Sequence, residues 1–255
     1  MNWKTFYALL SRDGHVARRN LLPMLVQNLL QPMLLTFVFG RVLTTSGMMQ
    51  GSYKSVLLPG IMAISMVLAG VQAVAMPLIA EFQFTREIED RLLAPMEIGW
   101  LAVEKIVAGM IQALVAGLVV IPAAWLTLGR GVNLNFEHPL EFVAVCLLVA
   151  FFSSVGGLAL GCSVGQTQIG LMFSLVLAPM MMFGCAYYPW SALRAFPVLQ
   201  YAVLINPLVY ASEGLRGTLT HVEHMNTWIV IAVLASVNVL LLALGLKKFH
   251  GKAVS

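Results

Sequence analysis

Charged residues are scarce in this sequence. Asp, Glu, Lys and Arg make up 10% of its 255 residues, whereas 60% are hydrophobic. A soluble globular domain carries about 25% charged residues, so this chain lacks the polar side chains that would cover a water-facing surface. The net charge of +4 is too small for a nucleic-acid-binding groove and suits anchoring at an anionic membrane surface. The composition predicts an integral membrane protein that contacts lipid and binds no nucleic acid.

Motifs for ATP binding and zinc hydrolysis are absent as well. The sequence has no GxxxxGK[ST] phosphate loop and no HExxH zinc motif. Its three cysteines, Cys146, Cys162 and Cys185, lie in apolar runs without metal-ligand spacing, so we interpret them as buried small hydrophobic residues. His221 and His224 have the i, i+3 spacing of a metal pair, but no third ligand is evident, and a polar loop is the alternative interpretation. We therefore expect no catalytic site, cofactor or metal in this chain.

Long runs without charge predict membrane-spanning helices. Such runs cover residues 21–39 and 55–80, the stretch between Lys105 and Arg130, and residues 227–246. Each is close to the roughly 20 apolar residues that a helical span needs. The uncharged stretch between Glu141 and Arg194 is long enough for two spans, with a turn at 161–168. Backbone groups in lipid must be satisfied within each segment, so the sequence predicts an all-α protein with six transmembrane helices.

The distribution of Lys and Arg predicts the orientation of these spans. Cytoplasmic segments carry an excess of Lys and Arg, and both ends of this chain are basic, which requires an even number of spans. The terminal basic residues are Lys4, Arg12, Arg18, Arg19, Lys247, Lys248 and Lys252. The loop after the second span adds Arg86 and Arg91. The opposite face would hold Arg41, Lys54, Arg130, Arg194 and Arg216.

Three segments outside the spans have patterns of their own. Residues 1–20 place Trp3, Phe6, Tyr7 and Leu10 at helical spacing among basic residues, which predicts an amphipathic interface helix or, alternatively, a polar leader. Residues 83–96 predict a short helix that ends before Pro95, and that helix either contacts a cytoplasmic partner or is a solvated connector. Residues 187–212 are largely apolar but interrupted by prolines, which favours a re-entrant helical hairpin in the outer leaflet over a seventh span.

Small residues recur at four-residue spacing in two predicted spans. They are Gly157, Gly161 and Gly165 in the fourth span and Gly109, Ala113 and Gly117 in the third. Small residues let helices approach closely in lipid. The pattern therefore predicts tight helix packing, either within one chain or between two chains.

The stretch from residue 187 to residue 216 resembles the signature of ABC-2 type exporter permeases. In that family a fifth span ends in a proline-containing turn, followed by a short re-entrant segment, an Asn-Pro-Leu-x-Tyr motif and an Arg. The matching positions here are Pro189, Pro197, Asn206, Pro207, Leu208, Tyr210 and Arg216. The run Leu92-Leu93-Ala94-Pro95 also resembles the family's cytoplasmic segment after the second span.

The resemblance implies a function and an assembly. Residues 1–255 would form one permease domain in a bacterial cytoplasmic (inner) membrane, with residues 1–20 as its interface helix. Two permease chains, as a homodimer or a paired heterodimer, would join two cytoplasmic P-loop ATPase subunits that bind ATP and Mg²⁺. The ATPase-coupling helix would present Arg86, Glu87, Ile88, Glu89, Asp90, Arg91 and Leu92. The exported molecule would be amphipathic, lipid-like or polysaccharide-linked. A membrane-embedded lipid-modifying enzyme and a passive conduit or secondary transporter are the alternatives.

Overall fold

The computed structural model describes residues 36–47, 53–83, 98–128 and 137–254, together with residues 10–12, 14, 15, 23, 26, 30, 33 and 34. These residues form helices and connecting turns, with no strand among them. The long helices are α4 (Tyr53–Gln83), α6 (Ile98–Leu128), α7 (Pro139–Ser163) and α12 (Thr227–Val254). The first continuous stretch of more than three described residues, 36–47, contains η1 (Val38–Val42) and α3 (Leu43–Thr45).

Within the described residues, four helices are long and apolar enough to cross a membrane. They are Tyr53–Phe82, Gly99–Thr127, Pro139–Ser163 and Thr227–Lys252. A shorter apolar helix, Ile169–Met182, combines α8 (Ile169–Leu171), η4 (Met172–Leu177) and α9 (Ala178–Met182). The chain is therefore an all-α, multi-pass membrane protein. Most of the first predicted span, residues 21–39, lies outside the described residues.

The turn predicted at residues 161–168 is confirmed. Helix α7 ends at Ser163, and after two residues the chain forms the short 3₁₀ helix η3 (Gln166–Gln168). The three cysteines are also buried and unbonded, as the sequence predicts.

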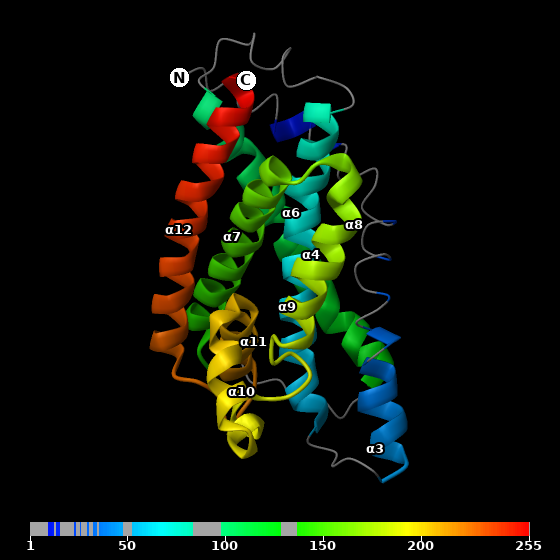
Figure 1. Ribbon diagram of the computed structural model, residues 1–255. Helices are drawn as coiled ribbons and strands as arrows, with labels where there is room; N and C mark the ends of the chain where they lie inside the picture. The colour runs from blue at the N-terminus through cyan, green and yellow to red at the C-terminus, as the bar shows by residue number, and fades with distance from the viewer. Residues whose placement is uncertain are drawn as a thin grey trace.

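The long helices form a bundle with two distinct ends (Figure 1). At one end, the last turns of α4, α7 and α12 meet the first turns of α6. There the Lys105 ammonium lies 2.9 Å from a Glu81 carboxylate oxygen, and Lys248 Nζ donates to Ser163 Oγ at 2.7 Å. The other end holds α10 (Pro197–Ala202) and α11 (Pro207–Leu219), of which α11 packs against α4.

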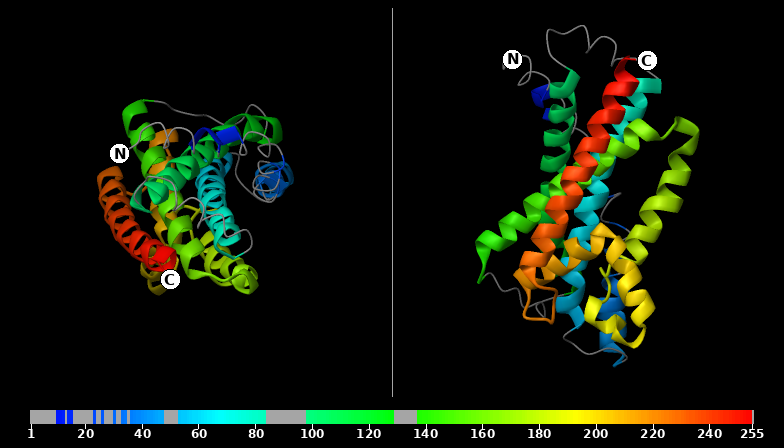
Figure 2. Two further views of the ribbon diagram at one scale, coloured as in Figure 1. Left: turned by 90° about the horizontal axis from the view of Figure 1, so that it is seen from above. Right: turned by 60° about the vertical axis from the view of Figure 1, so that its left-hand side comes forward.

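Helix α4 lies at the centre of the bundle and α12 at its edge. In the apolar part of each helix, 78% of α4 is buried, compared with 22% of α12. The views in Figure 2 show α12 along one side of the molecule, where Asn238 Nδ2 in α12 donates to the carbonyl of Leu148 in α7 at 3.0 Å. The exposed apolar side chains of α12 face outward, as expected of a lipid-facing helix.

Most of the small residues predicted to allow tight packing do so within this chain, but Gly165 does not, because α7 ends at Ser163 and Gly165 follows it. A Cβ atom on Gly161 would lie 2.9 Å from the Cα of Ala75, and one on Gly157 would lie 2.8 Å from the carbonyl oxygen of Val71. Both glycines are in α7 and both neighbours are in α4. Gly109 of α6 similarly faces Val74 of α4 at 2.4 Å. Small residues allow helices in lipid-embedded bundles to approach each other this closely.

The charges at the start of α6 lie inside the bundle. The sequence places Glu104 and Lys105 at the edge of a span, but α6 begins at Ile98, so both residues lie well within the helix. Glu104 is completely buried, and Lys105 and Glu81 are nearly so. A buried carboxylate–ammonium pair in this position is costly to form without close partners.

Candidate functional site

Residues 183–226, which we term the cap, connect α9 to α12 and close one end of the bundle. The cap contains η5 (Trp190–Ala195), α10, η6 (Val203–Ile205) and α11. Two of its prolines begin helices, since Pro197 and Pro207 are the first residues of α10 and α11. Proline suits this position because its missing N–H would have no partner within the helix.

Asn206 explains why the interrupted apolar run still folds into ordered structure. Its Oδ1 accepts from the backbone N–H of Leu208 at 3.0 Å, which caps the start of α11. Its Nδ2 donates to the carbonyl of Met180 at 2.7 Å. One side chain therefore both starts α11 and ties it to α9.

The Glu213 carboxylate joins three segments of the cap. This residue is 1% exposed. Its Oε1 accepts from the backbone N–H of Trp190 at 2.9 Å and from the guanidinium of Arg216. Its Oε2 accepts from the backbone N–H of Met225 at 3.0 Å. The start of η5, α11 and the segment before α12 are thus held by one charged group.

Arg216 extends this network to α4. The side chain is completely buried, and its Nη2 donates to the carbonyls of Cys185 at 2.9 Å and Val56 at 3.4 Å. Burial lowers the pKa of Arg216, while the neighbouring Glu213 carboxylate raises it. An arginine side chain keeps its charge in proteins, so the cap contains a buried ion pair.

Two further contacts dock the cap on α4. The Tyr53 hydroxyl donates to the carbonyl of Tyr187 at 2.5 Å. Gly60 approaches so closely that a Cβ atom there would lie 1.8 Å from the carbonyl oxygen of Ala186. The first half of α4 and the turn at residues 183–189 are therefore in direct backbone contact.

The structure brings most of the motif residues predicted from sequence into this one region. Helix α11 contains Pro207, Leu208, Tyr210 and Arg216, and Asn206 is its N-cap residue. Leu208 and Tyr210 are buried. Pro189 is the residue before η5, and Pro197 is the first residue of α10. Arg216, which the sequence analysis assigns to the non-cytoplasmic face, is not a loop charge in contact with solvent, because its side chain is wholly buried.

Sequence reasoning missed Glu213. The signal was present, since Glu213 and Arg216 are the only charged residues between positions 195 and 219. Two opposite charges at i, i+3 spacing in an otherwise apolar stretch are paired on one helix face. Such a pair would have indicated a buried interaction.

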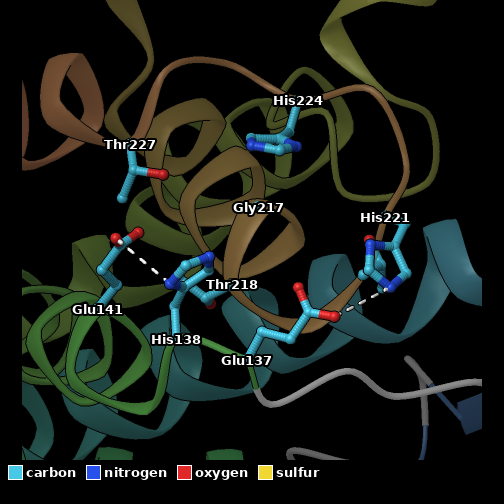
Figure 3. A pocket seen from close by; sticks show the side chains of 9 residues that line it. Glu137, His138, Glu141, Gly217, Thr218, His221, His224 and Thr227 are labelled. Atoms are coloured by element: carbon cyan, nitrogen blue, oxygen red, sulfur yellow. Dashed lines mark ion pairs between the residues drawn. The ribbon is translucent and has the colours of Figure 1, made fainter.

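A polar pocket of about 300 Å³ lies between the cap and the start of α7 (Figure 3). It is lined by Glu137, His138, Glu141, Gly217, Thr218, Thr220, His221, His224 and Thr227. His138 Nδ1 lies 4.0 Å from Glu141 Oε1, and His221 Nε2 lies 3.9 Å from Glu137 Oε1. His224 instead packs on Gly217. In the described part of the chain, no group of three or more His, Cys, Asp or Glu is arranged to hold a metal ion. His221 and His224 lie in the loop that precedes α12.

One sequence pattern of hydrolases occurs in the chain without its site. Residues 161–165 read Gly-Cys-Ser-Val-Gly, the GxSxG pattern in which serine sits on a strand-to-helix turn. Here Ser163 is the last residue of α7. Its hydroxyl donates back to the carbonyl of Ala159 and accepts from Lys248. The serine therefore completes a helix end and contacts no histidine base in the described structure.

The two remaining predicted segments lie wholly or largely outside the described residues. Residues 86–92, predicted as the coupling helix, fall between the end of α4 at Gln83 and the start of α6 at Ile98. Of the predicted interface helix, only residues 10–12, 14 and 15 are described, and they are helical.

Comparison with known proteins identifies the family. A family model described as ABC-2 type transporter matches residues 4–220. No curated protein matches the sequence. The matched region runs to the end of α11 and includes Asn206, Glu213 and Arg216. The chain therefore belongs to the ABC-2 type transporter family, whose members are the membrane permeases of ABC transporters and generally work with an ATPase subunit.

Proposed function

We propose that this chain is the membrane subunit of an ATP-driven exporter and that a separate cytoplasmic subunit hydrolyses the ATP. The observation that carries this proposal is membership of a transporter family in a chain without a phosphate-binding loop. A separate ATPase subunit would then supply the energy. The complex would contain two permease chains, as a homodimer, and two P-loop ATPase subunits that bind ATP and Mg²⁺.

We further propose that residues 1–255 form a single permease domain with six spans and both termini in the cytoplasm of a bacterial inner membrane. The directions of the helices support this layout, since α4 and α7 run away from the cap and α6 and Ile169–Met182 run back (Figure 1). The helix Ile169–Met182 is about 21 Å long at 1.5 Å per residue, shorter than the roughly 30 Å of hydrocarbon.

Residues 187–212 of the cap would fill the remaining depth of the hydrocarbon layer as a re-entrant segment. Its outer surface supports this proposal because Val198, Tyr201 and Ile205 are 86%, 68% and 88% exposed. Large apolar side chains exposed to this extent are stable when lipid covers them. Single cysteines at Ala195 and Glu223, both exposed, test the topology. A membrane-impermeant maleimide should label both from outside the cell, and labelling on opposite faces would replace the hairpin with a span.

An amphipathic or lipid-like substrate is supported by a second, apolar pocket. It has a volume of about 200 Å³ and lies between α4, α6 and α7. Its lining is Met62, Met66, Leu114, Leu118, Phe142, Val143, Cys146 and Leu147. Only apolar groups, such as an acyl chain, would gain by entering such a site.

Purification in mild detergent tests the proposed function. We expect the tagged chain to retain a P-loop ATPase in near-equal amount. Replacing Glu87, Asp90 and Arg91 together by alanine should release it, because these residues lie in the segment proposed to contact the ATPase. Glu223→Gln, an exposed change in the cap, is the control and should retain the ATPase. A single chain that purifies without any ATPase across several detergents would contradict the proposal.

A further inference from the structure

Helix α4 connects the two regions on which the proposed function depends. It contains 31 residues, or about 46 Å at 1.5 Å per residue. Its first turns contact the cap through Tyr53, Val56 and Gly60. Its last residue, Gln83, precedes the segment proposed to contact the ATPase. A continuous helix transmits displacement from one end to the other if both ends are firmly attached.

One of the contacts between the cap and α4 is positioned by Glu213, a residue of α11. Arg216 makes the contact with the Val56 carbonyl, but its guanidinium is held in place by Glu213. Glu213 is in turn fixed by the backbone N–H groups of Trp190 and Met225. Because charged hydrogen bonds in a low-dielectric interior are strong and directional, this chain of contacts sets where the Arg216 donors point.

The backbone is strained where the cap meets α4, and Arg216 contacts the strained residue directly. Cys185 has a φ of 51°, in the left-handed region that β-carbon sterics disfavour. The Cys185 carbonyl accepts from Arg216 Nη2 at 2.9 Å. Strained residues of this kind persist only where neighbouring contacts hold them, and they cluster at functional sites.

We propose that Glu213 is a positioning residue for transport: it orients Arg216 so that the cap and α4 move as one body during the ATPase cycle. This inference rests on the proposed function, because it requires an ATPase that acts at the far end of α4. If the ion pair served folding alone, its loss would reduce the amount of folded protein. As a positioning device, its loss leaves folded, ATPase-bound protein whose cap no longer follows α4.

Pulsed electron–electron double resonance measures the distance between two spin labels. Applied to the intact permease–ATPase complex, it reports this motion without a substrate. Spin labels at Tyr201→Cys in the cap and Met76→Cys in α4 occupy exposed positions, and the native cysteines are buried. We expect the distance between the labels to be the same without nucleotide and with ATP plus vanadate. In Glu213→Gln the distance should shift or broaden when nucleotide binds, because an uncharged amide holds the guanidinium weakly.

The cap supplies a matched control. Arg194 and Glu223 form an ion pair on its surface, with exposed side chains, so Glu223→Gln removes the same type of group without touching α4. It should behave as the unmodified chain. Arg216→Lys is the second test variant, since it keeps the buried positive charge but provides no planar fork to bridge two carbonyls. It should show the same nucleotide-dependent shift as Glu213→Gln.

The outcomes separate the inference from the function on which it rests. Co-purification and ATP hydrolysis report whether the chain works with an ATPase at all. If they are present and the cap–α4 distance already changes with nucleotide in the unmodified chain, the two do not move as one body and the inference is overturned. It is equally overturned if both test variants give the unmodified distances.

Discussion

Replacing adjacent glycines of α7 by alanine distinguishes packing within the chain from packing between chains. Gly156 has nothing within 4 Å of an added Cβ, whereas Gly157 would meet the Val71 carbonyl oxygen at 2.8 Å and Gly161 the Ala75 Cα at 2.9 Å. These neighbours are backbone atoms of α4, which cannot rotate away. Alanine at 157 or 161 must therefore push the two helices apart, while alanine at 156 meets open space.

The expected changes in the free energy of unfolding differ in sign between these variants. Overpacking costs about 1–3 kcal/mol, and replacing a helical glycine by alanine returns up to about 1 kcal/mol of helix propensity. We expect Gly157→Ala and Gly161→Ala each to lose roughly 1–2 kcal/mol of stability net of that gain, and Gly156→Ala to be neutral or slightly stabilising. For a chain of this size, 1 kcal/mol corresponds to roughly 2–4 °C in the unfolding midpoint.

The assay is the fraction of monodisperse protein that survives heating in detergent. Gly157→Ala and Gly161→Ala should lower the midpoint by about 2–8 °C, without a change in oligomer size. Two results would refute the reasoning. One is an equal loss in Gly156→Ala, which would mean that the effect does not depend on the α4 contact. The other is an unchanged midpoint with altered oligomer size in Gly161→Ala, which would place this stripe between chains.

Three further predictions follow from single contacts. Asn206→Ala removes the helix cap and the bond to the Met180 carbonyl and should cost about 1–2 kcal/mol, measured as a lower unfolding midpoint; an unchanged midpoint would contradict the capping role. Lys105→Met removes the ammonium 2.9 Å from Glu81 and should cost about 3–5 kcal/mol, most of which Glu81→Leu in the same chain should restore, as read from the yield of folded protein. Burial, with a smaller contribution from a nearby carboxylate, raises the pKa of Cys185 to about 12. Its thiol should therefore resist maleimide in folded protein, and raising the pH from 7 to 9 should not accelerate labelling as it does for an ordinary thiol with a pKa of about 8.5; rapid labelling before unfolding would show that the contact between the cap and α4 opens.

The sequence alone determined much of the helical architecture. Uncharged runs predicted α4, α6, α7 and α12. In lipid, each spanning segment must satisfy its own backbone hydrogen bonds, and a long apolar run in the local sequence is enough to identify such a segment. Charge-free length also predicted the turn after Ser163. Asn206 and Pro207 were singled out as a break in an apolar run, and they do interrupt it, since together they start a new helix.

Only the tertiary structure decided which residues meet. Glu213 contacts Trp190 and Met225, and Arg216 reaches Val56, which is 160 residues away in sequence. No local pattern contains that information, because it depends on how the cap folds back onto α4. The glycine stripe of α7 likewise predicted close packing but not its partner. Spacing along one helix defines a face, whereas the identity of the facing helix depends on the arrangement of the whole bundle.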